Sequence, residues 1–100
     1  LRDSVDVLLE AAPPGMDSEK IGYRMASLSG VDQVHDLHIW QITSGMPMLS
    51  AHVLVEPGAD CHGLRRELEE LLEHEFEIDH TTLQVEHTTR QEPIRLEPPA

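Results

Sequence analysis

Cysteine is almost absent from this 100-residue chain, and aromatic and basic residues are few. Because Cys61 is the single cysteine, the sequence offers no internal disulfide, no CxxC pair for redox chemistry and no zinc ribbon. Seven basic residues stand against nineteen acidic ones, which gives a formal charge of −12. This charge repels phosphate groups, so we expect no nucleic-acid partner and favour a cation.

Long apolar runs are also missing. No stretch approaches the roughly 20 apolar residues that a membrane-spanning helix needs. The start, Leu1-Arg2-Asp3, is typical of neither a signal peptide nor a natural initiation site, so we interpret the chain as a fragment of a longer protein. A chain of this length supports about one domain with one modest core.

Three segments have apolar residues at helical spacing. The first covers residues 1–12, ends at Pro13-Pro14-Gly15, and is expected to connect to a preceding segment. The second follows a cap at Asp17 or Ser18 and ends before Gly30. The third follows a cap at Asp60 and buries a leucine stripe beneath a surface of glutamates. The stripe consists of Leu64, Leu68, Leu71 and Leu72.

Three other segments alternate with a period of two, which predicts β-strands. The first begins at Val34 and, as a regular strand, would carry His38 and Trp40 on the side opposite His35. The second covers residues 49–56, after a turn at residues 44–47, and the third covers residues 81–87.

This order of elements predicts a small α+β domain with the order αββαβ. A strand–helix–strand crossover favours parallel pairing, so we expect a three-stranded mixed sheet with two helices on one face. The other face lies open to solvent or to a second subunit. The domain should cover residues 15–88, with residues 1–14 as a helical connector from a preceding segment and residues 89–100 as a flexible tail.

Histidine, the commonest metal-ligand side chain, occurs seven times. If the apolar sides of the strands meet the helices, His52 and Glu86 share the uncovered face. A hairpin register that pairs odd with even positions would add His35 to that face and turn His38 toward the helices, but the turn leaves the register open. His62 lies at the start of the last helix. Two or three imidazoles with a carboxylate suit tetrahedral zinc.

Each of these residues also has a plain structural interpretation. The histidines at 35, 52 and 62 could be ordinary exposed side chains, and we interpret His38 as a packed neighbour of Trp40. His74 and the glutamates around it are expected to form a solvated helix face.

Three motifs together resemble the C-terminal domain of the cation diffusion facilitator (CDF) family. They are Val-His-Asp-Leu-His-Ile-Trp at 34–40, Ser-Ala-His-Val at 50–53 and His-Thr-Thr-Leu-Gln-Val-Glu at 80–86. The resemblance runs from about Pro14 to Glu86. It implies a small ferredoxin-like (metallochaperone-like) domain on the cytoplasmic side of a divalent-metal transporter, which forms a homodimer and binds zinc or a related ion. It also implies six membrane helices before the domain, so that residues 1–14 connect to a preceding membrane segment.

The resemblance also implies a ligand set, which consists of His35, His52, His62 and Glu86. Gln84 departs from the pattern, because some members carry a ligand histidine there. Further candidate ligands are His80, at an uncertain offset from a family ligand, and His87, which is peculiar to this chain.

We therefore expect a non-enzymatic regulatory domain on the cytoplasmic face of the cell membrane. In this hypothesis zinc (or Co²⁺, Ni²⁺, Fe²⁺, Mn²⁺ or Cd²⁺) draws together the two arms of a V-shaped dimer and controls efflux by the attached transmembrane domain. The alternatives are a ligand-free structural dimerisation module, a free-standing metallochaperone and a small-molecule regulatory domain.

Overall fold

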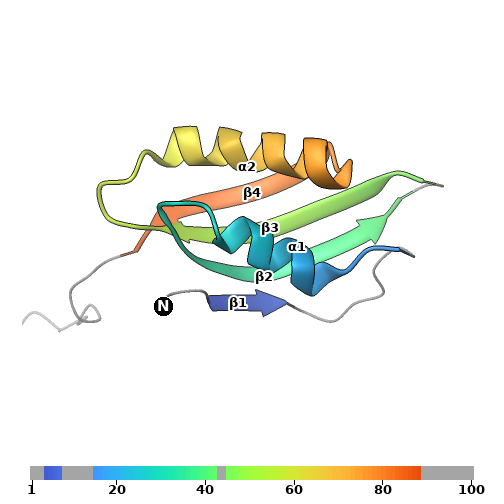
Figure 1. Ribbon diagram of the computed structural model, residues 1–100, viewed down its shortest axis with the longest axis horizontal. Coiled ribbons are helices and arrows are strands. Elements are labelled where there is room, and N and C mark those ends of the chain that lie inside the picture. The colour runs from blue at the N-terminus through green and yellow to red at the C-terminus, as the bar shows by residue number, and fades with distance from the viewer. Residues whose placement is uncertain (1–3, 8–14, 43–44, 89–100) are drawn as a thin grey trace, which may run out of the picture.

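A single mixed sheet with two helices packed against it forms the domain (Figure 1). The computed structural model describes residues 15–42 and 45–88, together with the backbone of residues 4–7. The elements are β1 (Ser4–Val7), α1 (Ser18–Ala26), β2 (Val31–Gln41), β3 (Pro47–Val55), α2 (Cys61–Phe76) and β4 (His80–His87). The strand order is β1-β2-β3-β4, with β2 and β3 antiparallel and the other two pairs parallel. The α+β class, the αββαβ order and the mixed sheet of β2, β3 and β4 are confirmed.

Both helices begin where the sequence predicts. The Asp17 side chain accepts a hydrogen bond from the Lys20 backbone N–H at 3.2 Å, and Asp60 accepts one from Gly63 at 3.1 Å. Each bond satisfies a donor that the first helical turn leaves unpaired. Neither helix of the described ranges has the length and apolar content needed to cross a bilayer.

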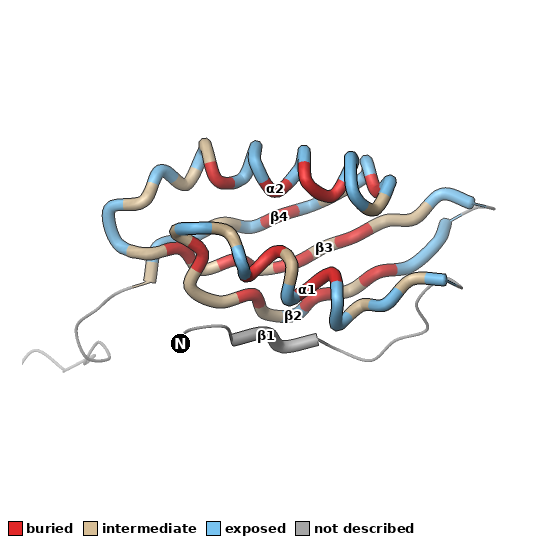
Figure 2. Tube along the Cα trace, viewed as in Figure 1, coloured by how far each residue is buried: buried red, intermediate tan, exposed pale blue. Residues whose placement is uncertain are grey.

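The hydrophobic core lies between the helices and one face of the sheet. Figure 2 shows the buried positions on the sides of α1 and α2 that face the strands. The predicted leucine stripe of α2 is buried, and so are the odd-numbered residues of β3 from Leu49 to Val55. The even-numbered residues of β3 and β4 are partly or fully exposed, so this second face has no helix on it.

A bulge in β2 changes which side chains reach that open face. Val34 pairs with Val53 and His35 with His52, but the next pair is His38 with Ser50, so β2 contains one extra residue at this point. Asp36 adopts a left-handed backbone with φ of 54°, as a bulge residue often does. As a result His35 and His38 both lie on the open face, whereas Leu37 is fully buried.

This finding corrects the regular alternation that we expected along this strand. His35 does share a face with His52, as the odd–even register predicts. His38 and Trp40 lie on the same open side and are not turned toward the helices, because the bulge shifts the alternation by one residue.

The helix expected over residues 1–12 is also wrong where the structure describes it. Ser4–Val7 forms the edge strand β1, which pairs in parallel with β2. An isolated helix of about 12 residues is marginal in water, whereas the edge of β2 offers unpaired backbone groups. The rest of the expected connector and the tail at 89–100 lie outside the described residues.

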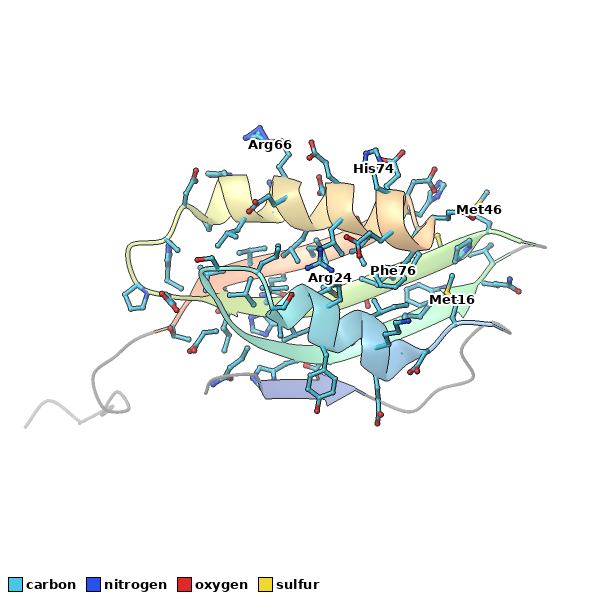
Figure 3. All side chains as sticks on the ribbon, in the orientation of Figure 1. Met16, Arg24, Met46, Arg66, His74 and Phe76 are labelled. Carbon is cyan, nitrogen blue, oxygen red and sulfur yellow. The ribbon has the colours of Figure 1, made fainter. Side chains whose placement is uncertain are left out.

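One ion pair ties the two helices together. The Arg24 guanidinium donates to both carboxylate oxygens of Glu75, at 3.0 and 2.8 Å, and to the Ser27 hydroxyl at 3.0 Å. Arg24 leaves α1 toward the C-terminal end of α2 (Figure 3). Its hydrogen bonds lower the pKa of Glu75 below the usual carboxyl value.

The bulge gives a first prediction. Asp36→Val should lower the free energy of unfolding by about 1–2 kcal/mol, because a β-branched residue is strained at positive φ, whereas Asn tolerates it. Asp36→Asn should therefore unfold within about 0.5 kcal/mol of the wild type, in line with ordinary surface changes. Urea unfolding followed by circular dichroism measures both, and equal stabilities of the two variants would contradict a left-handed residue at this position.

The ion pair gives a second prediction, on pH. The pKa of Glu75 is lower in the folded state than in the unfolded state. Its contribution to the free energy of unfolding is therefore present at neutral pH and is lost as the pH falls through the pKa of the folded state. Glu75→Gln should therefore be slightly less stable than the wild type at pH 7, and the difference should vanish in acid. Urea unfolding across this range measures the gap, with Glu70→Gln on exposed α2 surface as the control. A gap that persists at low pH would contradict this account.

Candidate metal centre on the open sheet face

The open face presents polar side chains in rows that cross three strands. His35, His52 and Gln84 occupy successive positions of one row on β2, β3 and β4. His38, Ser50 and Thr82 occupy the next row. Because paired residues of neighbouring strands have Cβ atoms about 4.5–5.5 Å apart, side chains within a row can interact directly.

His52 and Glu86 approach each other on this face, as predicted. The distance from His52 Nε2 to Glu86 Oε1 is 3.4 Å. The His52 side chain is 31% exposed, yet its Nε2 atom is enclosed and has no hydrogen-bond partner among the described residues. The 3.4 Å contact is longer than a good N–H···O bond of about 2.7–3.2 Å, so we regard it as a close approach and not as a hydrogen bond.

A metal ion between these two atoms fits the observed geometry. Zinc binds imidazole nitrogen and carboxylate oxygen at about 2.0–2.2 Å, and at tetrahedral angles two such donors stand about 3.3–3.6 Å apart. The separation of His52 Nε2 and Glu86 Oε1 lies within this range. An enclosed nitrogen with no partner costs about 1–3 kcal/mol, which a bound ion would offset. The two residues therefore fit a divalent metal.

Two glutamines contact the side chains of Glu86 and His35. Gln84 Nε2 donates to the other carboxylate oxygen of Glu86 at 3.1 Å, which leaves Oε1 directed at His52. The Nε2 atom of His35 contacts Gln33 Oε1. Such partners orient metal ligands and fix the tautomer of histidine. Gln84 stands where the family pattern can place a ligand, and in this chain it donates a hydrogen bond to Glu86.

The other three candidate ligands lie elsewhere. His62 is exposed in the first turn of α2, and α2 covers the opposite face, so one chain does not bring it to His52 and Glu86. His80 contacts Asp79 at 2.9 Å and is four residues from Gln84 on β4, about 13 Å at the usual rise of a strand. His87 Nε2 contacts the Ala59 carbonyl oxygen at 2.7 Å, beside the start of α2.

In the part of the chain that the structure describes, no three His, Cys, Asp or Glu side chains converge closely enough to enclose an ion. The pair of His52 and Glu86 is therefore the centre of the candidate site, and His35 is the neighbour best placed to join it.

Comparison with known families decides the wider identity. Residues 13–88 match the family model described as the cation efflux protein, cytoplasmic domain. The chain belongs to this family. Its cytoplasmic domain is the part of the transporter that the chain represents, so the expected class, a transporter domain, is confirmed.

Curated relatives are similar over most of this chain. A probable zinc transporter protein of Dictyostelium discoideum is 41% identical over 86% of the chain, which covers 16% of that protein. A cadmium, cobalt and zinc/H⁺-K⁺ antiporter of Bacillus subtilis is 36% identical over 85% of the chain and 28% of that protein. The chain spans between 10% and 28% of the length of the first relatives that it matches.

A solved structure agrees with the fold of this cation efflux domain. The metal-bound C-terminal domain of the CzcD transporter from Cuprividus metallidurans is 32% identical, with a TM-score of 0.66. The alignment covers 70% of the present chain and 97% of that one.

Two features of the cation efflux domain were missed by reasoning from sequence. The odd–even register was expected to turn His38 toward the helices, although this half-buried residue lies on the open face in the row next to His52. Gln33 was not considered, although it contacts His35. The extra residue that causes the first error has a faint signal in Asp36, since Asp is one of the few non-glycine residues that tolerate positive φ.

Proposed function

We propose that this domain binds a divalent metal ion on its open face and thereby regulates an attached efflux transporter. His52 and Glu86 supply the first two ligands, His35 the third, and water the fourth. The observation that carries the proposal is the 3.4 Å approach of the enclosed His52 Nε2 to Glu86. A bound ion would be held by residues of β3 and β4, and Gln84 would keep the Glu86 carboxylate in position.

Zinc is the ion that we assign first. The Dictyostelium and Bacillus relatives are named for zinc, the second also for cadmium and cobalt. Imidazole with carboxylate suits zinc but also cobalt, nickel, iron and manganese, because selectivity depends on geometry. The formal charge of −12 favours accumulation of any of these cations near the surface.

The proposed role is regulatory and not enzymatic, and it places the domain on the cytoplasmic face of a membrane within a longer transporter. The strand β2 carries His35 and also pairs with β1, which precedes the rest of the domain. A shift of β2 on metal binding would therefore reach the segment before the domain through backbone hydrogen bonds. The ion drives such a shift only as far as it binds one conformation more tightly than the other.

We also propose a homodimer. The end of the β2–β3 hairpin exposes three large apolar side chains, which are Trp40, Ile42 and Met46. Ile42 donates its backbone N–H to the Met46 carbonyl at 3.3 Å, so these two residues are neighbours. A second copy of the chain would remove this apolar surface from water.

Removal of the carboxylate tests the metal site. Glu86→Gln should lower zinc affinity about tenfold or more while keeping the size of the side chain, since changes even around a metal ligand cost about 10–100-fold. Calorimetry at pH 7 measures the affinity, and binding should weaken as pH is lowered because protons compete for imidazole. Glu70→Gln, a matched change on α2, should bind like the wild type.

Two results would contradict the proposed site. One is a wild-type affinity no tighter than millimolar. The other is a Glu86→Gln variant that binds and is stabilised by zinc as strongly as the wild type, since a bound ion raises the melting temperature by mass action. A dimer that persists without any metal response would instead support a purely structural dimerisation module.

A substitution that introduces a charge at the apolar end of the β2–β3 hairpin tests the proposed dimer. Ile42→Glu, at a side chain that is 58% exposed, should weaken self-association about tenfold or more, because burying an unpaired carboxylate costs at least about 1.4 kcal/mol. Sedimentation equilibrium measures the effect, and Tyr23→Glu, at an exposed residue of α1, is the control. A monomeric wild type, or equal dissociation constants, would contradict this interface.

A further inference from the structure

A hollow of about 350 Å³ opens on the sheet face beside the proposed zinc site. Its lining includes Asp36, His38, Ser50, His52, Thr82 and Gln84. The strand register separates it from Glu86, because Ser50 pairs with Thr82 one step to one side of His52, whereas Leu54 pairs with Glu86 one step to the other side. The hollow is therefore a separate place for a ligand.

The bulge in β2 creates this hollow. It allows His35, Asp36 and His38 to lie on the open side while only Leu37 between them is buried. Across from His38 stands Ser50, and beyond it Thr82, both with short side chains. These two residues line the hollow together with Asp36, His38 and His52.

The groups that line the hollow match the needs of a divalent cation. Asp36 offers a carboxylate, His38 an imidazole, and Ser50 and Thr82 hydroxyl oxygens. Imidazole and carboxylate both bind first-row divalent ions, and a partly hydrated ion accepts hydroxyl and water oxygens in its remaining positions. Among the described residues that line the hollow there is no lysine or arginine, whose charge would oppose that of the ion.

We propose that this hollow is a second divalent-cation site, with Asp36 and His38 as its protein ligands. It goes beyond the proposed function, which uses the other side of His52. Because two protein ligands are assigned to it, against three at the first site, it binds more weakly than the first site. The second site fills only when metal is abundant.

Metal stoichiometry of the whole 100-residue chain tests the proposal. Equilibrium dialysis and calorimetry with Zn²⁺ should give two ions per chain, the second bound about tenfold or more weakly than the first, a difference of about 1.4 kcal/mol. Asp36→Asn and His38→Gln should each weaken the second event about tenfold or more and leave the first within about twofold. Asn is chosen at position 36 because it tolerates the positive φ of the bulge.

Matched variants separate this site from the first. Glu86→Gln should weaken the first event and preserve the second. His74→Gln removes an imidazole that projects from α2 away from the sheet, as Figure 3 shows, and should change neither event. Urea unfolding of each variant checks that the fold is retained.

The outcomes distinguish the two proposals. In one outcome the wild type binds a single ion, Glu86→Gln weakens its affinity, and Asp36→Asn and His38→Gln leave the affinity unchanged. This result overturns the second site and supports the first. In another outcome a single ion binds, Asp36→Asn and His38→Gln weaken its affinity, and Glu86→Gln does not. This result supports the site in the hollow and overturns the site at Glu86. A wild type that binds no zinc overturns both.

Discussion

The parallel pairing of β3 with β4 is the constraint on which the site depends. The crossover through α2 fixes this pairing, and α2 buries its leucine stripe against one side of the strands. With that side occupied, the even-numbered residues of both strands must lie on the other. The register then sets His52 beside Gln84, one step from Glu86. The closeness of His52 to Glu86 is therefore a consequence of how the core packs.

Alternation along β3 and β4 made the central pair of the site predictable. Leu49, Val53 and Leu83 identify the buried side without any knowledge of the partner strand, and His52 and Glu86 follow by parity. The same reasoning failed on β2 because one extra residue reverses the parity after it, and a bulge depends on how two neighbouring strands pair. Side-chain details such as the contact of Gln33 with His35 also require coordinates, since spacing alone does not orient a side chain.

The first strand shows a different limit of sequence reasoning. Apolar residues in the first twelve positions fit a helical period, yet Ser4–Val7 forms a strand. Helical spacing in so short a segment is a weak preference, and the backbone of β2 supplies a competing set of hydrogen bonds that lies far away in sequence. The register of β1 skips one residue of β2 between Val34 and Leu37, so β1 accommodates the same bulge as β3 does.

This shared bulge connects the two proposed ions to the rest of the molecule. His35 lies on one side of it and His38 on the other, and Asp36 stands at its centre in a backbone conformation that few residues adopt readily. An ion that draws His35 toward β4, or one that fixes Asp36 and His38, acts on the same short stretch of β2. Because β1 and β3 both pair with that stretch, its displacement would act on both neighbouring strands. Metal occupancy on the open face would thus change the position of β1, which is the means by which binding could reach a membrane segment.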